Sequence, residues 1–437
     1  MTRVALTTLG CKVNQYESAE IIEDLRKMGF DIVPFDSEAD IYIVNTCTVT
    51  GKTDYQSRQL LRRAHRKNPS AAIVATGCYA QIDPDKLASL PGIKMVVGTE
   101  AKKEIPRMIG NIAKDGQKVI VSDVAFMERL SSTPVDRFPG HTRAFLKIQD
   151  GCNSFCSYCI VPYARGRSRS LTEDAVISQI KKFSGSGYRE IVLTGIHLGL
   201  YGHDLVPRTG LIKLLRRIEY LGIIDRLRIS SIEPMEITDE IIAHIGNSKI
   251  MCRHLHIPLQ SGDDGILTSM KRNYTSRQFR DVIEKICDAI PEIAIGMDVM
   301  VGFPGEGEKE FNNTRDFIES IPVAYLHVFP YSKRPGTVAA EIPGQVQEAI
   351  KKERARDLST LGREKRIAFN SRFVGERLSV LIENRKDRET GLLKGFSDNY
   401  IPFLIKDGDQ SLVNCIVDIV SYGADKEKLL GRKVIHA

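Results

Sequence analysis

Short apolar runs alternate with helical patterns throughout residues 1–118. The runs are rich in β-branched residues, which favours buried strands, and the segments between them have apolar residues at helical spacing. Because the order strand, helix, strand is typical of a parallel sheet, we predict an N-terminal parallel α/β domain over this region. The predicted strands are Val4–Leu9, Ile41–Val44 and Ala71–Thr76, and the predicted helices are Ser18–Met28 and Ser57–Arg66.

The pattern of strand then helix repeats six times over residues 142–369. Six consecutive β/α units predict a partial (β/α)6 barrel, in which loops at the carboxyl ends of the strands carry the chemistry. A basic amphipathic helix over Gln345–Arg372 leads out of this region. The predicted strands are Ala144–Gln149, Glu190–Thr194, Arg226–Ser230, His254–Leu259, Ile295–Val301 and Tyr325–Phe329, and the predicted helices include Leu171–Phe183, Leu211–Leu221, Arg277–Ala289 and Glu308–Ser320.

Two segments depart from this pattern. Residues 119–141 are polar and contain several serines, Pro134, Pro139 and Gly140, which predicts a linker. Residues 370–437 form short apolar runs separated by polar turns, which predicts a small antiparallel β-barrel. The predicted strands of this C-terminal domain are Leu378–Glu383, Gly391–Phe396, Ile401–Ile405 and Val413–Val420.

Composition narrows the class of protein only a little. A hydrophobic fraction of 42% with 27% charged residues is ordinary for a globular protein, and the net charge of +7 is compatible with a polyanionic partner without requiring one. Residues 1–15 lack the features of a signal peptide, and no apolar run is long enough to span a bilayer. We therefore expect a cytoplasmic protein that has no membrane contact.

Three of the nine cysteines follow the first strand of the six-unit region, in the segment GCNSFCSYCI. Cys152, Cys156 and Cys159 have the spacing to bind three irons of a four-iron cluster, which leaves the fourth iron open to another ligand. A structural zinc site is the alternative, but such sites usually close with four ligands and favour Cys-x2-Cys pairs. The sequence therefore predicts an iron–sulfur cluster here.

Three more cysteines stand just beyond the three N-terminal strands, in TTLGC, IVNTC and VATGC. Any one of Cys11, Cys47 and Cys78 alone would be interpreted as a small buried hydrophobe. Because the carboxyl ends of parallel strands open onto one crevice, we expect the three to converge and to bind a second cluster with one open iron. The remaining cysteines, Cys252, Cys287 and Cys415, are predicted to pack in cores.

These motifs together resemble the methylthiotransferase branch of the radical S-adenosylmethionine (SAM) enzymes. The three cysteines of residues 152–159 match the radical SAM signature, and the C-terminal region resembles the TRAM domain, a small β-barrel associated with RNA binding. The resemblance covers nearly the whole chain. The matching segments are LGCKVNQYES (Leu9–Ser18), NTCTVT (Asn45–Thr50), ATGCYAQ (Ala75–Gln81), VPYARGRSRS (Val161–Ser170), SSIEP (Ser230–Pro234), HIPLQSG (His256–Gly262) and MDVMVGFPGE (Met297–Glu306).

The resemblance implies methylthiolation of C2 of N6-threonylcarbamoyladenosine at position 37 of tRNA, since GCKVNQYES and TCTVT look most like the enzymes with that substrate. It implies two [4Fe-4S] clusters, with SAM as radical source and methyl donor. The cluster on Cys152, Cys156 and Cys159 would bind SAM, and the cluster on the other three cysteines would hold the sulfur. Breaking an unactivated C–H bond requires a radical, and an electron donor such as flavodoxin or ferredoxin is implied.

The resemblance also implies SAM contacts at the ends of the barrel strands, although turn chemistry for Gly195 and Gly302 and a cap for Asp298 are alternatives. Arginines and a lysine on the helix over Ser57–Arg66 could bind RNA phosphates, as could Lys351–Arg366, but a charged helix face is usually only solvated. The target base would have to leave its stack in the anticodon loop. The implied SAM contacts are Thr194, Gly195, Arg165, Ser231, Gln260, Asp298 and Gly302, and the candidate RNA contacts are Arg58, Arg62, Arg63, Arg66 and Lys67.

Other functions stay open at this point. The same chemistry could act on isopentenyladenosine in tRNA or on a ribosomal-protein aspartate, although the segment LGCKVNQYES argues against the aspartate. A non-catalytic iron–sulfur electron carrier or a redox-sensing RNA-binding protein would use the clusters without cleaving SAM. The complete set of barrel segments argues against this second class, and a metal-free RNA-binding scaffold leaves six placed cysteines unexplained.

Overall fold

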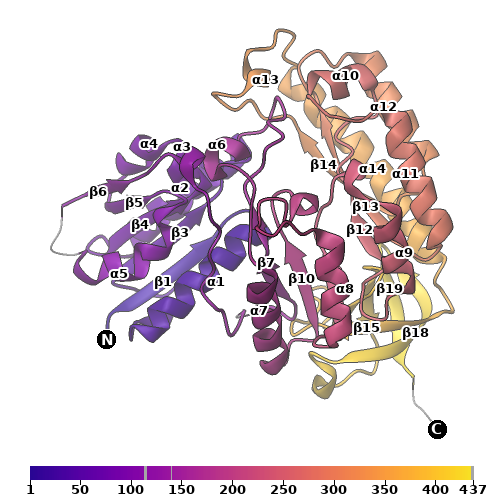
Figure 1. The fold of residues 1–437 in the computed structure, drawn as a ribbon, viewed down its shortest axis with the longest axis horizontal. Coiled ribbons are helices and arrows are strands. Elements are labelled where there is room, and N and C mark those ends of the chain that lie inside the picture. The colour runs from indigo at the N-terminus through magenta and orange to yellow at the C-terminus, as the bar shows by residue number, and fades with distance from the viewer. Residues whose placement is uncertain (113–115, 139, 435–437) are drawn as a thin grey trace.

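The structure is a computed structural model that describes residues 1–112, 116–138 and 140–434. Figure 1 shows an N-terminal sheet with its helices, a central set of strands and helices, and a small C-terminal barrel. Pro139 of the predicted linker lies outside the described residues, as do residues 113–115 and 435–437 of the predicted terminal domains. Within the described ranges, no helix has the length and apolar character needed to cross a membrane.

The N-terminal sheet has six parallel strands in the order β2-β1-β3-β4-β5-β6. Its two faces are both buried: Ile43 of β3 packs in one cluster with Leu25 of α1, and Val44 packs in another with Leu61 of α2. Burial on both faces explains why these strands are continuous apolar runs. The bounds are β1 Arg3–Thr8, β2 Asp31–Val33, β3 Ile41–Thr46, β4 Ala72–Gly77, β5 Ile93–Val97, β6 Lys118–Ile120, α1 Lys12–Lys27, α2 Gly51–Lys67, α3 Cys78–Ile82, α4 Pro84–Ala88 and α5 Ile105–Met108.

The predicted parallel α/β domain is confirmed, with its three strands and two helices in place. Three strands of the sheet, β2, β5 and β6, were not predicted. β2 and β6 have only three residues each and lie at the edges of the sheet, so they are too short to produce a recognisable pattern. Pairing of β6 with β5 carries this sheet on to Ile120.

The central strands follow one another in chain order and pair in parallel, as predicted for a partial (β/α)6 barrel. Two bridges, Leu227 to Met251 and Ser231 to His256, join β11 to β12 and so connect the two three-stranded halves. The first predicted strand is split, because Gln149–Asp150 turns away to pair with Arg169–Ser170. The strands are β7 Ala144–Lys147, β8 Gln149–Asp150, β9 Arg169–Ser170, β10 Glu190–Thr194, β11 Arg226–Ile229, β12 His254–His256, β13 Ala294–Val301 and β14 Tyr325–Pro330.

Helices cover the outer face of the central strands, and one large apolar cluster fills the space between them (Figure 1). The last helix, α14, packs along β14 and leads to the C-terminal barrel. Cys252 is buried and Cys287 packs partly against this core, so both predictions of core packing are confirmed. The helices are α6 Val161–Arg165, α7 Glu173–Gly185, α8 Leu211–Leu221, α9 Asp239–Asn247, α10 Asp264–Ser269, α11 Ser276–Ala289, α12 Glu308–Ser320, α13 Val338–Glu341 and α14 Glu348–Ser371.

The C-terminal strands close into a barrel in the order β15-β16-β17-β19-β18. The predicted small barrel is confirmed and is antiparallel except where β17 pairs in parallel with β19, the strand that was not predicted. The prediction that Cys415 packs in a strand is wrong, because β18 begins one residue later and the thiol is exposed. The bounds are β15 Arg377–Ile382, β16 Leu393–Ser397, β17 Pro402–Ile405, β18 Ile416–Asp425 and β19 Lys428–Lys433.

Candidate active site

Three cysteines lie at the carboxyl edge of the N-terminal sheet. Cys11 precedes α1, Cys47 follows β3, and Cys78 begins α3 directly after β4. Gly10 has a φ of +99°, and a Cβ at this position would lie 2.9 Å from the Cys47 sulfur, so only glycine allows the loops of Cys11 and Cys47 to approach this closely. The structure thus brings these distant cysteines to one place.

Asn14, in the first turn of α1, connects the three cysteine loops. Its Nδ2 donates to the carbonyl of Leu9 at 2.8 Å and to the carbonyl of Thr46 at 3.1 Å, and both acceptors lie next to cysteine loops. The Cys78 sulfur lies 4.0 Å from its Oδ1, which also accepts a hydrogen bond from Arg165. Asn14 is fully buried, and the signal for it in the sequence is its place three residues after Cys11 in the segment LGCKVNQYES.

The second set, Cys152, Cys156 and Cys159, lies in the loop between β8 and α6. The Cys152 sulfur is 3.3 Å from Nδ1 of His197, and the Cys156 sulfur is 3.4 Å from a guanidinium nitrogen of Arg272. Burial opposes ionisation of Cys152, but its contacts with His197 and a backbone amide lower its pKa. This favours the thiolate that metal binding requires.

His197 and Arg272 were not predicted as site residues, and each is held by a carboxylate. Nε2 of His197 lies 2.6 Å from Glu236, and Arg272 forms an ion pair with Glu233. Burial opposes the charged imidazole, but Cys152 and Glu236 raise the pKa of His197 to about 10. The sequence pattern carries little signal for these pairs, because their members are far apart along the chain.

The chemistry of the donors suits clusters rather than single ions. Among the residues that the structure describes, one set of three or more His, Cys, Asp or Glu side chains has its ligand atoms within 4.8 Å of one another, and it contains no cysteine. The sulfur atoms of each cysteine set are therefore spread more widely than the ligands of one zinc ion. Three separated thiolates suit a four-iron cluster, in which each cysteine binds a different iron.

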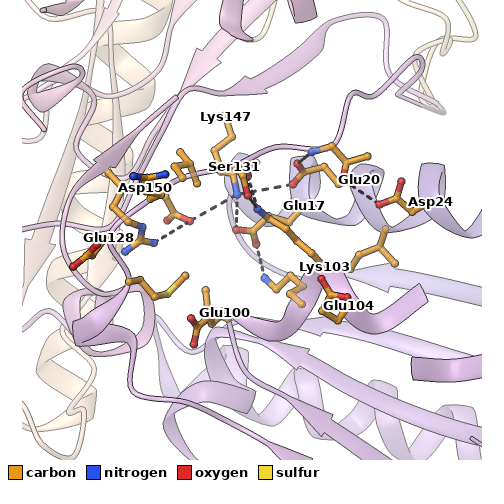
Figure 2. Close-up of a pocket in the computed structure, with 18 of the residues that line it drawn as sticks. Glu17, Glu20, Asp24, Glu100, Lys103, Glu104, Glu128, Ser131, Lys147 and Asp150 are labelled. Carbon is orange, nitrogen blue, oxygen red and sulfur yellow. Dashed lines mark hydrogen bonds and ion pairs between the residues drawn. The ribbon is translucent and has the colours of Figure 1, made fainter. Parts of the chain in front are cut away.

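A buried ionic network joins the two cysteine-bearing regions, and Figure 2 shows its members Glu17, Lys147 and Asp150. The Arg165 guanidinium of α6 lies 2.9 Å from Glu17 of α1 and 2.8 Å from Asp150 of β8, and all three side chains are almost fully buried. Lys147 of β7 and Lys102 also pair with Glu17. Burial alone would raise the pKa of Glu17, but these three cations hold it well below its usual value.

This network borders a cavity of about 480 Å³ between the N-terminal domain and the barrel. Figure 2 shows Glu17, Glu20 and Lys147 directed toward one another at its centre. Ser132 and Thr133 of the predicted linker bind Glu20 from the other side, at 2.8 Å each. The linker therefore packs against α1 rather than extending freely.

The structure places the predicted SAM contacts in several positions. Thr194 is buried at the end of β10, Gly195 packs against Gln149, and Gly302 packs against Lys351. Gln260 has a φ of +65°, and its backbone N–H donates to the backbone carbonyl of Asp298 at 2.9 Å. Arg165 lies in the ionic network, and the remaining two, Ser231 and Asp298, line a cavity inside the barrel.

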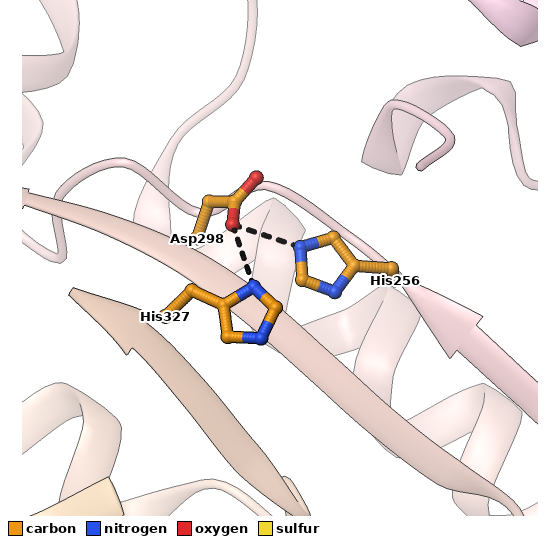
Figure 3. Close-up of side chains that lie close together, drawn as sticks. All are labelled: His256, Asp298 and His327. Carbon is orange, nitrogen blue, oxygen red and sulfur yellow. Dashed lines mark ion pairs between the residues drawn. The ribbon is translucent and has the colours of Figure 1, made fainter. Parts of the chain in front are cut away.

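Asp298 forms a compact group with two histidines on neighbouring strands (Figure 3). Its Oδ1 lies 2.9 Å from Nε2 of His256 and 3.5 Å from Nδ1 of His327. Burial alone would raise the pKa of Asp298, but its contacts with the two imidazoles hold it well below the usual range. The carboxylate therefore stays charged at neutral pH.

The barrel cavity has a volume of about 260 Å³ and is lined by all three units of the chain. Lys12 enters it from the N-terminal domain, Arg143 and Arg228 from the central barrel, and Tyr400 from the C-terminal barrel. Burial alone would raise the pKa of Tyr400, but Arg143, Lys12 and Arg228 lower it. Three cations therefore lie near the Tyr400 hydroxyl in this cavity, which the Asp298 carboxylate also lines.

The candidate RNA contacts differ in what they already bind. Arg58 donates to the Tyr79 hydroxyl at 2.7 Å, whereas the remaining four are exposed on α2, where Arg63 pairs with Asp36. On α14, Lys351 and Arg354 are buried and pair with Glu348 and Glu306. The exposed face of α2 is thus freer to meet a polyanion than the start of α14.

Two families match this chain: the Uncharacterized protein family UPF0004 over residues 3–98, and the Radical SAM superfamily over residues 146–318. The threonylcarbamoyladenosine tRNA methylthiotransferase MtaB of Bacillus subtilis is 41% identical over 423 residues, which cover 96% of this chain and 93% of the relative. A tRNA-2-methylthio-N(6)-dimethylallyladenosine synthase of Pelotomaculum thermopropionicum is 34% identical and covers 99% of this chain and 97% of its own length.

A solved structure has a similar fold. The radical S-adenosylmethionine methyltransferase TsrM from Kitasatospora setae superposes with a TM-score of 0.58 at 16% identity, over 78% of this chain and 77% of that protein. At this identity the likeness concerns the fold alone. It agrees with the arrangement of a parallel α/β domain beside a partial barrel.

Proposed function

The chain belongs to the radical SAM methylthiotransferase family, and we propose that it methylthiolates C2 of N6-threonylcarbamoyladenosine at position 37 of tRNA. The product is 2-methylthio-N6-threonylcarbamoyladenosine. The identity of 41% with the relative named for threonylcarbamoyladenosine, against 34% with the one named for dimethylallyladenosine, supports this choice of substrate.

The observation that carries this proposal is the presence of two separate three-cysteine sets beside one barrel. Generating a radical from SAM requires only the set at residues 152–159. The set formed by Cys11, Cys47 and Cys78 has no part in that step, and a reaction that inserts sulfur gives it a purpose. Three thiolates leave one iron of each cluster open to a ligand.

When bound, the two clusters and SAM supply an electron, a radical able to remove the C2 hydrogen, the sulfur and the methyl group. The protein's own residues hold and orient these groups. His197 and Arg272 orient the thiolates of Cys152 and Cys156, and Arg165 ties the loops of both sets together. The barrel cavity would admit the target base. The SAM contacts proposed on the strand ends are Thr194, Gly195, Arg165, Ser231, Gln260, Asp298 and Gly302.

The partners follow from the same reaction. The tRNA anticodon loop would lie along the exposed arginines of α2 and reach the C-terminal barrel, with its target base unstacked. A cytoplasmic electron donor such as flavodoxin or ferredoxin would reduce the cluster at Cys152, Cys156 and Cys159. The domains proposed for these tasks are residues 1–118, 142–369 and 370–437, joined by the linker at 119–141.

Nucleoside analysis of tRNA tests the proposal. The gene is deleted from its host, total tRNA is digested, and modified nucleosides are quantified by mass spectrometry, with wild-type and Cys156→Ala chains as complements. We expect the 2-methylthio nucleoside to disappear, its precursor to accumulate, and only the wild-type chain to restore it. Loss of the isopentenyl counterpart instead would refute the substrate, and an unchanged nucleoside profile would refute the function.

A further inference from the structure

Lys12 places a positive charge in the barrel cavity without a counter-ion. Across the described residues the structure records no ion pair or hydrogen bond for its ammonium. The two arginines of the same cavity are paired: Arg143 donates to Glu383 at 3.0 Å and Arg228 to Glu190 at 2.8 Å. Partial burial removes water molecules that would bind the ammonium, and an unpaired site provides no protein group to replace them. The Lys12 ammonium is therefore available to bind an anion.

The position of Lys12 restricts which anion can reach it. It directly follows Cys11 of one cysteine set, and it shares its cavity with Ser231 and Asp298, which are proposed to contact SAM. A base held for reaction between the two sets would occupy this cavity. The cavity volume of about 260 Å³ lies just below the usual range for ligand sites, so it suits a substituted base rather than a whole nucleotide.

The chemistry of the substrate provides a matching group. A threonylcarbamoyl substituent is attached to N6 through its carbonyl and ends in a free threonine carboxylate. An isopentenyl substituent carries no charge and offers nothing to an ammonium. Charge-assisted hydrogen bonds between an ammonium and a carboxylate are stronger than neutral ones, so such a contact discriminates between the two substituents.

We propose that Lys12 binds the carboxylate of the threonylcarbamoyl group and thereby selects this substituent over uncharged ones. Arg143 lies beside it and adds to the positive potential, while the rings of Tyr325 and Tyr400 line the same cavity. This inference rests on the proposed function and assigns its substrate specificity to one residue. The carboxylate of SAM is the other anion of the same chemistry that could come near, and the test separates the two.

The test compares anticodon stem-loops that differ in one group. One loop carries N6-threonylcarbamoyladenosine at position 37, and the second carries the analogue whose carboxylate is a carboxamide. Dissociation constants are measured by fluorescence anisotropy for the reconstituted full-length protein and for its Lys12→Met, Lys12→Arg and Lys27→Met variants. Lys27 is the matched control, because it lies at the far end of the same helix and is exposed. Iron content of each variant verifies that it is folded and loaded.

We expect the wild-type protein to bind the carboxylate loop about tenfold more tightly than the carboxamide loop, which corresponds to about 1.4 kcal/mol. Lys12→Met should bind both loops with the affinity that the wild-type protein has for the carboxamide loop. Lys12→Arg and Lys27→Met should keep the preference. If Lys12→Met is misfolded, Lys12→Gln provides the same comparison, since it also removes the charge.

Three results would overturn the inference. Lys12→Met could retain the preference for the carboxylate loop, or it could weaken the binding of both loops by the same factor. It could also weaken SAM binding in equilibrium dialysis while the preference between the loops is unchanged. The last result would assign the lysine to the SAM carboxylate. Mass spectrometry of the same loops separates this inference from the proposed function: wild-type product on the threonylcarbamoyl loop keeps the function even where the inference fails, and absence of product refutes the function itself.

Discussion

At the residue scale, Asn14 holds more of the site than its position in the sequence suggests. It is fully buried, and its amide nitrogen donates to two carbonyls that belong to different cysteine loops. An aspartate could not replace it, because a carboxylate cannot donate to those carbonyls. The three strand ends thus depend on one side chain for their mutual position.

Replacing Asn14 with alanine should therefore disturb one cysteine set and spare the other. We expect Asn14→Ala to lose about 1–3 kcal/mol of unfolding free energy, because it leaves buried carbonyls unpaired. Reconstituted protein should lose the iron held by Cys11, Cys47 and Cys78, measured by iron analysis, and keep SAM cleavage. Asn68→Ala is the matched control, since Asn68 also donates to a carbonyl, that of Ala39, but away from the cysteines. Equal iron loss in both variants would contradict this account.

At the element scale, the sequence predicts individual strands better than the ionic contacts between elements. Continuous β-branched runs identified β1, β3 and β4, and the cysteine after each followed from the geometry of parallel sheets. The pairing of Glu17 on α1 with Lys147 on β7 spans 130 residues of chain. No local pattern encodes such a contact, because charged residues on a helix are usually solvated and only the tertiary fold buries them.

The network between α1, β7 and α6 should make stability depend on pH. Because Lys102, Lys147 and Arg165 depress the pKa of Glu17 in the folded state, its contribution is present at neutral pH and is lost as the pH falls below the carboxylate's unfolded value. Glu17→Gln should cost about 3–5 kcal/mol at pH 7, since it leaves buried cations unpaired. Urea unfolding should show that the difference in unfolding free energy from wild type is nearly constant from pH 7 to pH 5 and narrows as the pH falls from about 4.5 toward about 2.

Glu104→Gln is the control for this measurement. Glu104 pairs with Arg107 on the surface, where ion pairs contribute about 0–1 kcal/mol. Its replacement should leave the pH profile of unfolding close to that of wild type. If the unfolding free energies of Glu17→Gln and wild type still differed by a constant amount between about pH 4.5 and about pH 2, the ionised carboxylate of Glu17 would not stabilise the fold.

At the scale of the whole molecule, the C-terminal barrel is part of the catalytic unit rather than a tethered appendage. Arg228 of β11 donates to the carbonyls of Asp398 and Ser397, and His254 packs against the ring of Tyr400 at 4.7 Å between centroids. The sequence predicted this domain from its short strands and resemblance. It could not predict that the domain lines the central cavity, because that depends on how the units pack.

Arg228→Met should destabilise the assembled protein. Glu190 is fully buried beneath it and would lose its closest partner, which typically costs about 3–5 kcal/mol. Urea unfolding followed by circular dichroism measures the loss, and limited proteolysis should show faster cleavage at residues 371–376, where the barrel joins α14. Arg217→Met, on an exposed arginine of α8, should match wild type in both assays. Unchanged unfolding of Arg228→Met would mean that the two units are independent.

The two cysteine sets divide the reaction between the N-terminal domain and the central barrel, so the effects of losing each set should be separable. Cys78→Ala should retain roughly half of the iron and still cleave SAM, whereas Cys156→Ala should retain the other half and lose SAM cleavage. Neither variant should form the methylthio nucleoside. Cys415→Ala, at an exposed thiol, should behave as wild type in all three measurements. If Cys78→Ala abolished SAM cleavage as well, the sets would act as one structural unit, and the division of sulfur supply from radical formation would be wrong.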